Sequence, residues 1–195
     1  MGVARYSEVT AIQTQGARMA TWTADFLGPD YQQREIPLGE DPDGEGIISA
    51  TLIRHHGTVD PTTATQAVIY VHGYTDYFYN TEFAEFFANR GIAFYALDLR
   101  KCGRSRQPGQ SAHYVSHLAL YDAELEDAVR IVNEEAPNAK VAFAAHSTGG
   151  LVVPLWLDRL NERTQGVDAF SINGLILNSP WFDLQGSAVV REIST

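Results

Sequence analysis

The chain has 195 residues, of which 45% are hydrophobic and 19% charged, a balance that suits one domain with a sizeable core and argues against disorder. Its net charge of −10 disfavours nucleic acid as a partner, because phosphate binding needs a cationic face. A single cysteine, Cys102, excludes an internal disulfide and fits the reducing conditions of the cytoplasm, where we expect the protein to act.

The N-terminal part of the chain predicts an arm followed by a β-hairpin. Residues 1–28 carry weak patterning and no apolar segment of a signal peptide, so we expect an arm there and a core domain over 29–195. Residues 31–38 suit an edge strand and 47–54 a second strand. The segment between them, 41–46, is rich in Asp and Gly and predicts a turn, so the two strands should pair as an antiparallel hairpin.

Beyond residue 66 the sequence alternates between strand and helix patterns. Short apolar runs, typical of strands buried on both faces, lie at 67–71, 92–97, 140–145 and 174–177. Helical spacing of apolar residues is found at 81–90, 116–135 and 148–163, with Pro154 inside the last. No run approaches the roughly 18 apolar residues of a membrane span. This order predicts an α/β fold with a mostly parallel sheet, flanking helices and right-handed crossovers.

One turn carries the strongest chemical signal of the chain. An apolar run delivers Ser147 into a tight turn, with Ala145 two residues before it and Gly149 two residues after it. Small residues are needed at these positions because the backbones of the strand and the following helix pass very close there. Such a turn pushes its central side chain out above the sheet, so Ser147 is predicted to be a nucleophile.

A second loop, His72-Gly73-Tyr74, follows the first parallel strand. Ligands of open α/β sheets bind at the carboxyl ends of the strands, so this loop should lie near Ser147. Its glycine lets the chain turn a backbone N–H toward the space above the serine, and acyl transfer needs two such donors for its oxyanion. The candidates are the N–H groups of Tyr74 and Thr148. Taken alone, the loop is also typical of a turn that merely ends a strand.

Three motifs occur in the order and spacing of the α/β-hydrolase superfamily: residues 72–74, 98–105 and 145–149. Over about residues 25–185 the chain resembles the serine aminopeptidase and monoacylglycerol-lipase-like branch, often described as lysophospholipases. The resemblance implies that Ser147 is the nucleophile and that the amides of Tyr74 and Thr148 hold the oxyanion. Supporting residues of the loop and turn would be His72, Gly73, His146 and Gly149. We expect neither a cofactor nor a metal.

The resemblance also implies a triad acid and a histidine that the chain does not supply. Only 45 residues follow Gly150, and none of them is histidine. Asp183 is the one candidate acid, but it has no histidine to orient. We therefore expect a C-terminally truncated core, with the last strands and final helix missing, that turns over very poorly.

The upstream histidines are not expected to supply the base. His146 should be buried beside its strand and point away from Ser147, and His72 should pack under the oxyanion loop. His113 and His117 lie four residues apart near the predicted start of a helix. We interpret them as a surface pair, with a metal site as the alternative.

Two charged segments are expected to face solvent. The first is the basic loop with Arg100, Lys101, Arg104 and Arg106, for which a phosphate or head-group contact is the alternative. The second is the acidic side of the helix at 116–135, with Asp122, Glu124, Glu126 and Asp127. Cys102 lies in the basic loop without a histidine-asparagine partnership and is not a candidate nucleophile.

The leading hypothesis is the N-terminal core of a serine hydrolase that cleaves carboxylic, lipid-like esters through an acyl-enzyme on Ser147. The second is a non-catalytic fragment that acts by association. The third is a peptidase or a cofactor-free peroxidase, because one fold hosts many chemistries. If no strand follows 174–177, that strand is an exposed apolar edge, so we also expect self-association through it.

Overall fold

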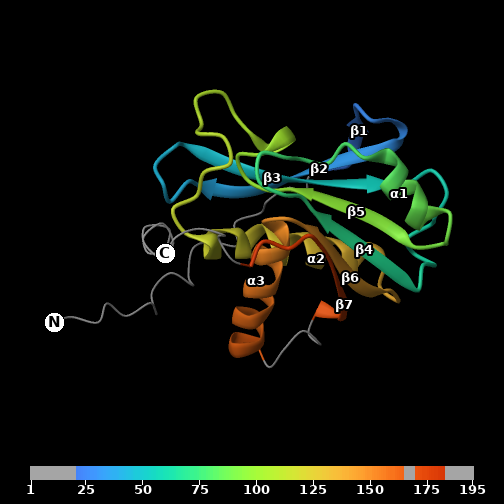
Figure 1. Cartoon of the computed structure of the whole chain (residues 1–195). Coiled ribbons are helices and arrows are strands. Elements are labelled where there is room, and N and C mark those ends of the chain that lie inside the picture. Colours follow the sequence, from blue (N-terminus) through green and yellow to red (C-terminus); the bar gives the residue numbers. More distant parts are fainter. Residues whose placement is uncertain (1–20, 165–169, 183–195) are drawn as a thin grey trace.

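The computed structural model describes residues 21–164 and 170–182, which form a seven-stranded sheet flanked by helices (Figure 1). The strand order is β1-β2-β3-β5-β4-β6-β7. Asp183 and residues 1–20 of the expected arm lie outside the described residues. No helix in the described part of the chain is long and apolar enough to cross a membrane.

The first part of the sheet is antiparallel. Strands β1 (Thr23–Asp25), β2 (Gly28–Glu40) and β3 (Ile47–His55) pair in sequence order, so the predicted hairpin of β2 and β3 is confirmed. The backbone N–H of Asp41 closes its turn by donating to the Gly46 carbonyl at 2.7 Å. The prediction that β2 is an edge strand is wrong, because β1 covers its outer side.

The remaining strands pair in parallel, as the alternating pattern predicts. They are β4 (Gln66–Val71), β5 (Ala93–Asp98), β6 (Lys140–His146) and β7 (Ile172–Asn178). Strand β4 lies at the centre of this half, paired with β5 on one side and β6 on the other. The chain therefore leaves β4 toward β5 and later crosses over β4 to reach β6.

Helices cover both faces of the sheet, with α2 (Asp122–Glu135) and α3 (Gly149–Thr164) gathered on one side (Figure 1). Their apolar faces supply Leu125, Val129 and Trp156 to the larger buried cluster. The short α1 (Thr81–Ala88) contributes Ala84 and Phe87 to a second cluster. The mostly parallel α/β architecture is thus built from two cores on opposite faces of one sheet.

The second helix begins later than its sequence pattern predicts. Residues Leu118–Tyr121 form a 3₁₀ turn, and α2 starts at Asp122. His117 has an extended backbone, and its side chain accepts a hydrogen bond from the Ala119 N–H at 3.1 Å. This cap satisfies a donor at the start of the turn and fixes the entry into α2. His117 is thus occupied by the backbone rather than paired with His113.

Arg100 and Glu124 form a buried ion pair, so the prediction that these two residues face solvent is wrong. Arg100 is 3% exposed and Glu124 is fully buried in α2. The Arg100 guanidinium donates to both carboxylate oxygens of Glu124, with its Nε 2.9 Å from Oε1. Burial raises the pKa of the Glu124 carboxyl, and the guanidinium opposes that rise.

Arg104 and Lys101 of the basic loop are also held by carboxylates, whereas Arg106 is exposed, as the sequence predicts. Arg104 donates to Asp25 at 2.7 Å and to Asp98 at 2.9 Å. Lys101 has no exposed surface, and its Nζ lies 2.5 Å from the Asp41 carboxylate. Arg100, Lys101 and Arg104 therefore connect the loop to the sheet and the hairpin instead of facing solvent. Its acidic partners come from distant segments, so local charge patterning could not reveal them.

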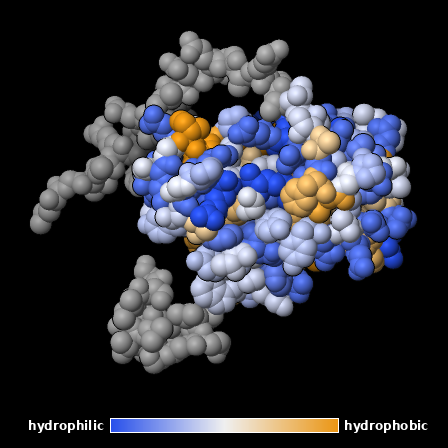
Figure 2. Space-filling model, turned by 90° about the horizontal axis from the view of Figure 1, so that it is seen from above, coloured by the Kyte–Doolittle hydropathy of each residue, from blue (hydrophilic) through white to orange (hydrophobic). Residues whose placement is uncertain are grey.

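Strand β7 ends the sheet in the described part of the chain, and it and the residues after it expose apolar side chains. Leu175, Ile176, Trp181 and Phe182 all retain at least a third of their surface, and Ile176 is 50% exposed. The face seen in Figure 2 is mostly hydrophilic, with the hydrophobic colours confined to small separate patches.

Candidate active site

The carboxyl ends of β4 and β6 lie side by side where the chain changes direction across the sheet. The connection after β4 leads to β5, whereas the connection after β6 leads to β7 on the opposite side. Loops that leave in opposite directions open a crevice at the strand ends, where ligands bind in open α/β sheets. The loop after β4 and the turn at Ser147 meet here, since a Cβ on Gly73 would lie 3.0 Å from the Ser147 Cβ.

Ser147 occupies the turn between β6 and α3 with a positive φ of 51°. Residues other than glycine rarely adopt this left-handed conformation, and the strain it carries clusters at functional sites. The backbone on both sides holds the turn in place. The Ser147 N–H donates to the Asn178 carbonyl at 3.1 Å, and the Ser147 carbonyl accepts from the Trp181 N–H at 3.0 Å. The end of β7 thus clamps the turn.

The small residues around Ser147 are required by close backbone contacts. A Cβ on Gly149 would lie 2.5 Å from the His72 carbonyl oxygen and 2.7 Å from that of Val71. A Cβ on Gly150 would lie 2.8 Å from the Cβ of Pro180. The strand–turn–helix geometry expected at 145–149 is present, and α3 could not begin this close to β4 with a larger residue at 149.

His72 is buried under the loop after β4. It is 2% exposed, its Nε2 accepts from the Leu99 N–H at 3.1 Å, and its Nδ1 lies 2.7 Å from the Gly73 carbonyl oxygen. A ring nitrogen that accepts carries no proton, so the neutral tautomer with hydrogen on Nδ1 fits both contacts. His72 therefore ties the loop to the end of β5 and has no free nitrogen to serve as a base.

Two backbone N–H groups near Ser147 have no hydrogen-bond partner among the described residues. In the described part of the chain, neither the Tyr74 N–H nor the Thr148 N–H donates a hydrogen bond. Thr148 immediately precedes α3, so its N–H lies where the helix dipole favours negative charge. Tyr74 and Thr148 both line one cavity. That these two N–H groups form an oxyanion hole stays a prediction.

That cavity has a volume of about 280 Å³ and is mostly apolar. Its apolar lining includes Leu99, Val115, Leu118 and Val152, with Trp181 also bordering it. His113 lies in the wall with its ring centroid 5.7 Å from that of Tyr74. Burial lowers the pKa of His113, which favours the neutral imidazole.

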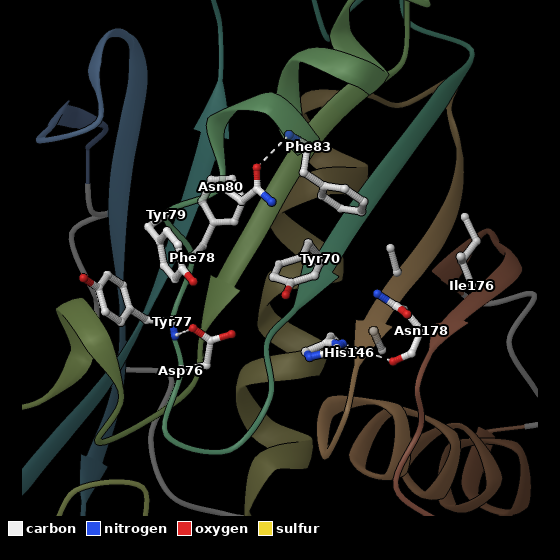
Figure 3. Close-up of a pocket in the computed structure, with 12 residues that line it drawn as sticks. Tyr70, Asp76, Tyr77, Phe78, Tyr79, Asn80, Phe83, His146, Ile176 and Asn178 are labelled. Atoms are coloured by element: carbon white, nitrogen blue, oxygen red, sulfur yellow. Dashed lines mark hydrogen bonds between the residues drawn. The ribbon is translucent and has the colours of Figure 1, made fainter.

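A second cavity of about 280 Å³ lies beside the end of β6 and is rich in aromatic side chains. Figure 3 shows Tyr70, Phe83 and Tyr79 around it, with His146 next to Asn178. The His146 Nδ1 lies 3.2 Å from the Asn178 carbonyl oxygen. His146 is half-buried in this wall rather than fully buried beside its strand, which corrects the prediction made for it.

Among the described residues, no histidine is in place as a base for Ser147. The six histidines of the sequence all fall within the described residues, and none of them hydrogen-bonds to the Ser147 hydroxyl there. Burial lowers the pKa of the His55 imidazole, whose ring packs against Tyr31. Within residues 21–164 and 170–182 no three metal-ligating side chains lie together.

Sequence reasoning missed the residues that clamp and wall the site. Asn178 and Trp181 hold the Ser147 turn through backbone atoms, which leave no trace in the side-chain pattern. The wall residues around His113 lie in an irregular loop with no periodicity. The stretch of turn residues near Pro108 and Gly109 indicates a loop but not where it lies.

The family model described as serine aminopeptidase, S33, matches residues 62–194. No curated protein matches the sequence.

Three solved structures have a similar fold, and two of them are described as esterases. A thermostable carboxyl esterase from Bacillus coagulans is 14% identical with a TM-score of 0.54, covering 74% of this chain and 43% of that chain. DcsB in complex with its substrate analogue is 21% identical with a TM-score of 0.56, covering 84% and 50%. Brefeldin A esterase, a bacterial homologue of human hormone sensitive lipase, is 18% identical with a TM-score of 0.50, covering 84% and 44%. These likenesses show the fold, and the chain spans about half of each structure or less.

Proposed function

Since the chain belongs to the serine aminopeptidase family S33 of the α/β-hydrolases, we propose that its site hydrolyses carboxylic esters through an acyl-enzyme on Ser147. The Ser147 oxygen would attack the ester carbonyl, and the alcohol would leave with a proton. Water would then attack the acyl-enzyme, release the carboxylic acid and return the serine hydroxyl.

One observation carries this proposal. Ser147 is held at a positive φ against Gly73, beside two N–H groups that have no hydrogen-bond partner among the described residues. The tetrahedral intermediate would place its oxyanion on the amides of Tyr74 and Thr148, and each donor of this kind contributes about 3–4 kcal/mol to lowering the barrier. The apolar cavity beside these amides supports a lipid-like acyl group.

The 195-residue chain should turn over slowly. No histidine hydrogen-bonds to the Ser147 hydroxyl in the described residues, so no general base activates it there. Loss of a triad member costs about four powers of ten or more in rate, while the oxyanion donors and substrate binding still contribute.

Substrate preference tests the proposal directly. We expect slow release of p-nitrophenol from p-nitrophenyl butyrate, and slower cleavage of an aminoacyl p-nitroanilide. Ser147→Ala should abolish ester cleavage, whereas Ser179→Ala, one residue after Asn178, should leave it unchanged. Faster cleavage of the anilide would favour a peptidase, and equal ester cleavage by Ser147→Ala would remove Ser147 from the mechanism.

A second candidate function is association through β7. This strand ends the described sheet with Leu175 and Ile176 exposed, and such edges pair with other chains unless they are covered. The purified protein should therefore form dimers or larger species in light scattering. A monomer at high concentration that binds no hydrophobic dye would refute this candidate.

We also propose that the protein acts in the cytoplasm. Cys102 is a buried free thiol, and burial raises its pKa to about 12, so the thiol stays protonated and unreactive. Both features fit a compartment in which thiols remain reduced.

A further inference from the structure

One wall of the apolar cavity is a loop without a helix or strand of its own. Residues 106–117 contain no regular element, yet they supply His113, Tyr114 and Val115 to the cavity. A backbone segment without its own hydrogen-bond ladder must be held by contacts with other parts of the chain. The position of this wall therefore depends on the contacts that the loop makes with other parts of the chain.

The tip of the β2–β3 hairpin supplies these contacts on both sides of the wall residues. The Ser111 N–H donates to the Glu45 carboxylate at 3.1 Å. The Ser116 N–H donates to the Asp43 carboxylate, also at 3.1 Å. These two bonds lie on either side of His113–Val115. The acidic tip, residues Asp41–Glu45, therefore binds the loop at both ends of the segment that lines the cavity.

Lys101 joins the tip to the middle of the same loop. Its Nζ lies 2.5 Å from the Asp41 carboxylate and 2.8 Å from that of Glu45. Its carbonyl accepts from the His113 N–H at 3.1 Å, and its Nζ lies 5.6 Å from the centroid of the Tyr114 ring. Lys101 is completely buried, so solvent screens its ion pairs little.

We propose that the acidic hairpin tip, through Lys101, positions the wall 113–115 of the apolar cavity and so sets the length of the acyl chain that the site accepts. The inference rests on the proposed function, in which this cavity receives the acyl group. Asp43, Glu45 and Lys101 are positioning residues here, because they bond to the wall or to the residues that flank it and do not line the cavity. With a volume of about 280 Å³, the cavity lies just below the range of drug-sized ligand sites and fits a short acyl chain.

A purely structural role for the tip gives a different expectation. In that case, loss of a tip contact would lower stability, while the folded fraction would bind short and long chains in the same ratio as before. If the tip positions the wall, the folded protein itself should lose its discrimination between chain lengths. The ratio of two affinities therefore separates the two roles.

The test uses the full chain with Ser147→Ala, so that binding is measured apart from the reaction. The ligands are methyl ketones of four to eight carbons, which carry the acyl half of an ester but cannot be hydrolysed. Dissociation constants are measured by titration of backbone amide signals in NMR spectra. Burial of CH₂ groups alone predicts that affinity rises with each added carbon. In the parent, Ser147→Ala, we instead expect affinity to fall beyond a certain chain length.

The decisive variant is Glu45→Ala, and Glu126→Ala is its matched control. The Glu45 side chain is 23% exposed and that of Glu126 is 24%, and each pairs with one cation, at 2.8 Å for Glu45 and 2.6 Å for Glu126. Glu126 lies on α2 and pairs with Arg163, away from the cavity lining. Glu45→Ala should reduce the ratio of long-chain to short-chain dissociation constants about tenfold. Glu126→Ala should leave that ratio unchanged.

An unchanged ratio in Glu45→Ala, or no ketone binding by the parent, would overturn the inference. If Glu45→Ala does not fold, Glu45→Gln decides the question in its place. It retains an oxygen for the Ser111 N–H and removes only the ion pair with Lys101, so a smaller loss of selectivity supports the inference and an unchanged ratio overturns it. Chain-length selectivity in Ser147→Ala, together with no reaction at Ser147 in the wild-type chain, would refute the proposed function and leave this inference standing.

Discussion

Removal of the Arg100 guanidinium should destabilise the protein strongly and in a pH-dependent way. In Arg100→Met the fully buried Glu124 carboxylate loses three contacts with the guanidinium and keeps one bond from the Arg100 backbone N–H, at 3.3 Å. A buried charge left without its partner costs about 3–5 kcal/mol of unfolding free energy. We therefore expect a loss of that size at pH 7.5.

The loss should shrink as the pH falls. Burial already raises the pKa of Glu124, and without the guanidinium the folded-state pKa lies further above its unfolded value. An acid of this kind binds more protons in the folded state, so the variant gains stability relative to the wild type as the pH decreases. Once the carboxyl is neutral, the remaining cost is that of a poorly satisfied polar group, about 1–3 kcal/mol.

Urea unfolding followed by far-UV circular dichroism at pH 7.5 and pH 5 measures both effects. The double variant Arg100→Met/Glu124→Leu serves as the control, because an apolar replacement of the whole pair is often neutral or stabilising. It should recover most of the stability at pH 7.5. A single variant within about 1 kcal/mol of the wild type at pH 7.5, or a double variant no better than the single, would refute the reasoning.

Three further predictions follow from named contacts. Gly149→Ala should lower the unfolding free energy by about 1–3 kcal/mol and slow any reaction at Ser147, because its Cβ would lie 2.5 Å from the His72 carbonyl oxygen. Urea unfolding measures the change in stability, and an unchanged midpoint would contradict this prediction. The pKa of Glu45 is lowered to about 2 by hydrogen bonds from Lys101 and Ser111, so its contribution to stability is present above the ordinary pKa near 4.5 and is lost as the pH falls toward 2. The melting temperatures of wild type and Glu45→Gln should converge over that range, and a constant difference would be inconsistent with the ion pair. Cys102 should resist alkylation by iodoacetamide at pH 8 in the folded protein and react only in denaturant, because burial raises its pKa to about 12; rapid native alkylation would show that the thiol is accessible.

The sequence predicted the parallel half of the sheet and the turn at Ser147 well, because both depend on local signals. Short apolar runs mark strands that are covered on both faces, and a small residue on each side of Ser147 marks a close backbone approach. Gly149 shows why the second signal works, since a side chain there would collide with the backbone at the end of β4.

The basic loop was mispredicted because its partners are distant in sequence. Lys101 meets Asp41 and Glu45 across some sixty residues, and Arg104 meets Asp25 across 79. A run of basic residues usually faces solvent, and the neighbouring sequence does not reveal that carboxylates from distant segments pair with it. The cavity wall was missed for a related reason. Irregular loops are placed by tertiary contacts, and those contacts have no period to detect.

The location and pH dependence of fluorophosphonate labelling test the central claim most directly. We predict a slow, single adduct on Ser147, located by peptide mass spectrometry and absent from Ser147→Ala. Because no histidine hydrogen-bonds to this hydroxyl in the described residues, the rate should keep rising with pH above 7 and should not level off near the ordinary pKa of histidine, about 6.5. An adduct on another residue, or no adduct at any pH, would contradict the assignment of Ser147 as the nucleophile.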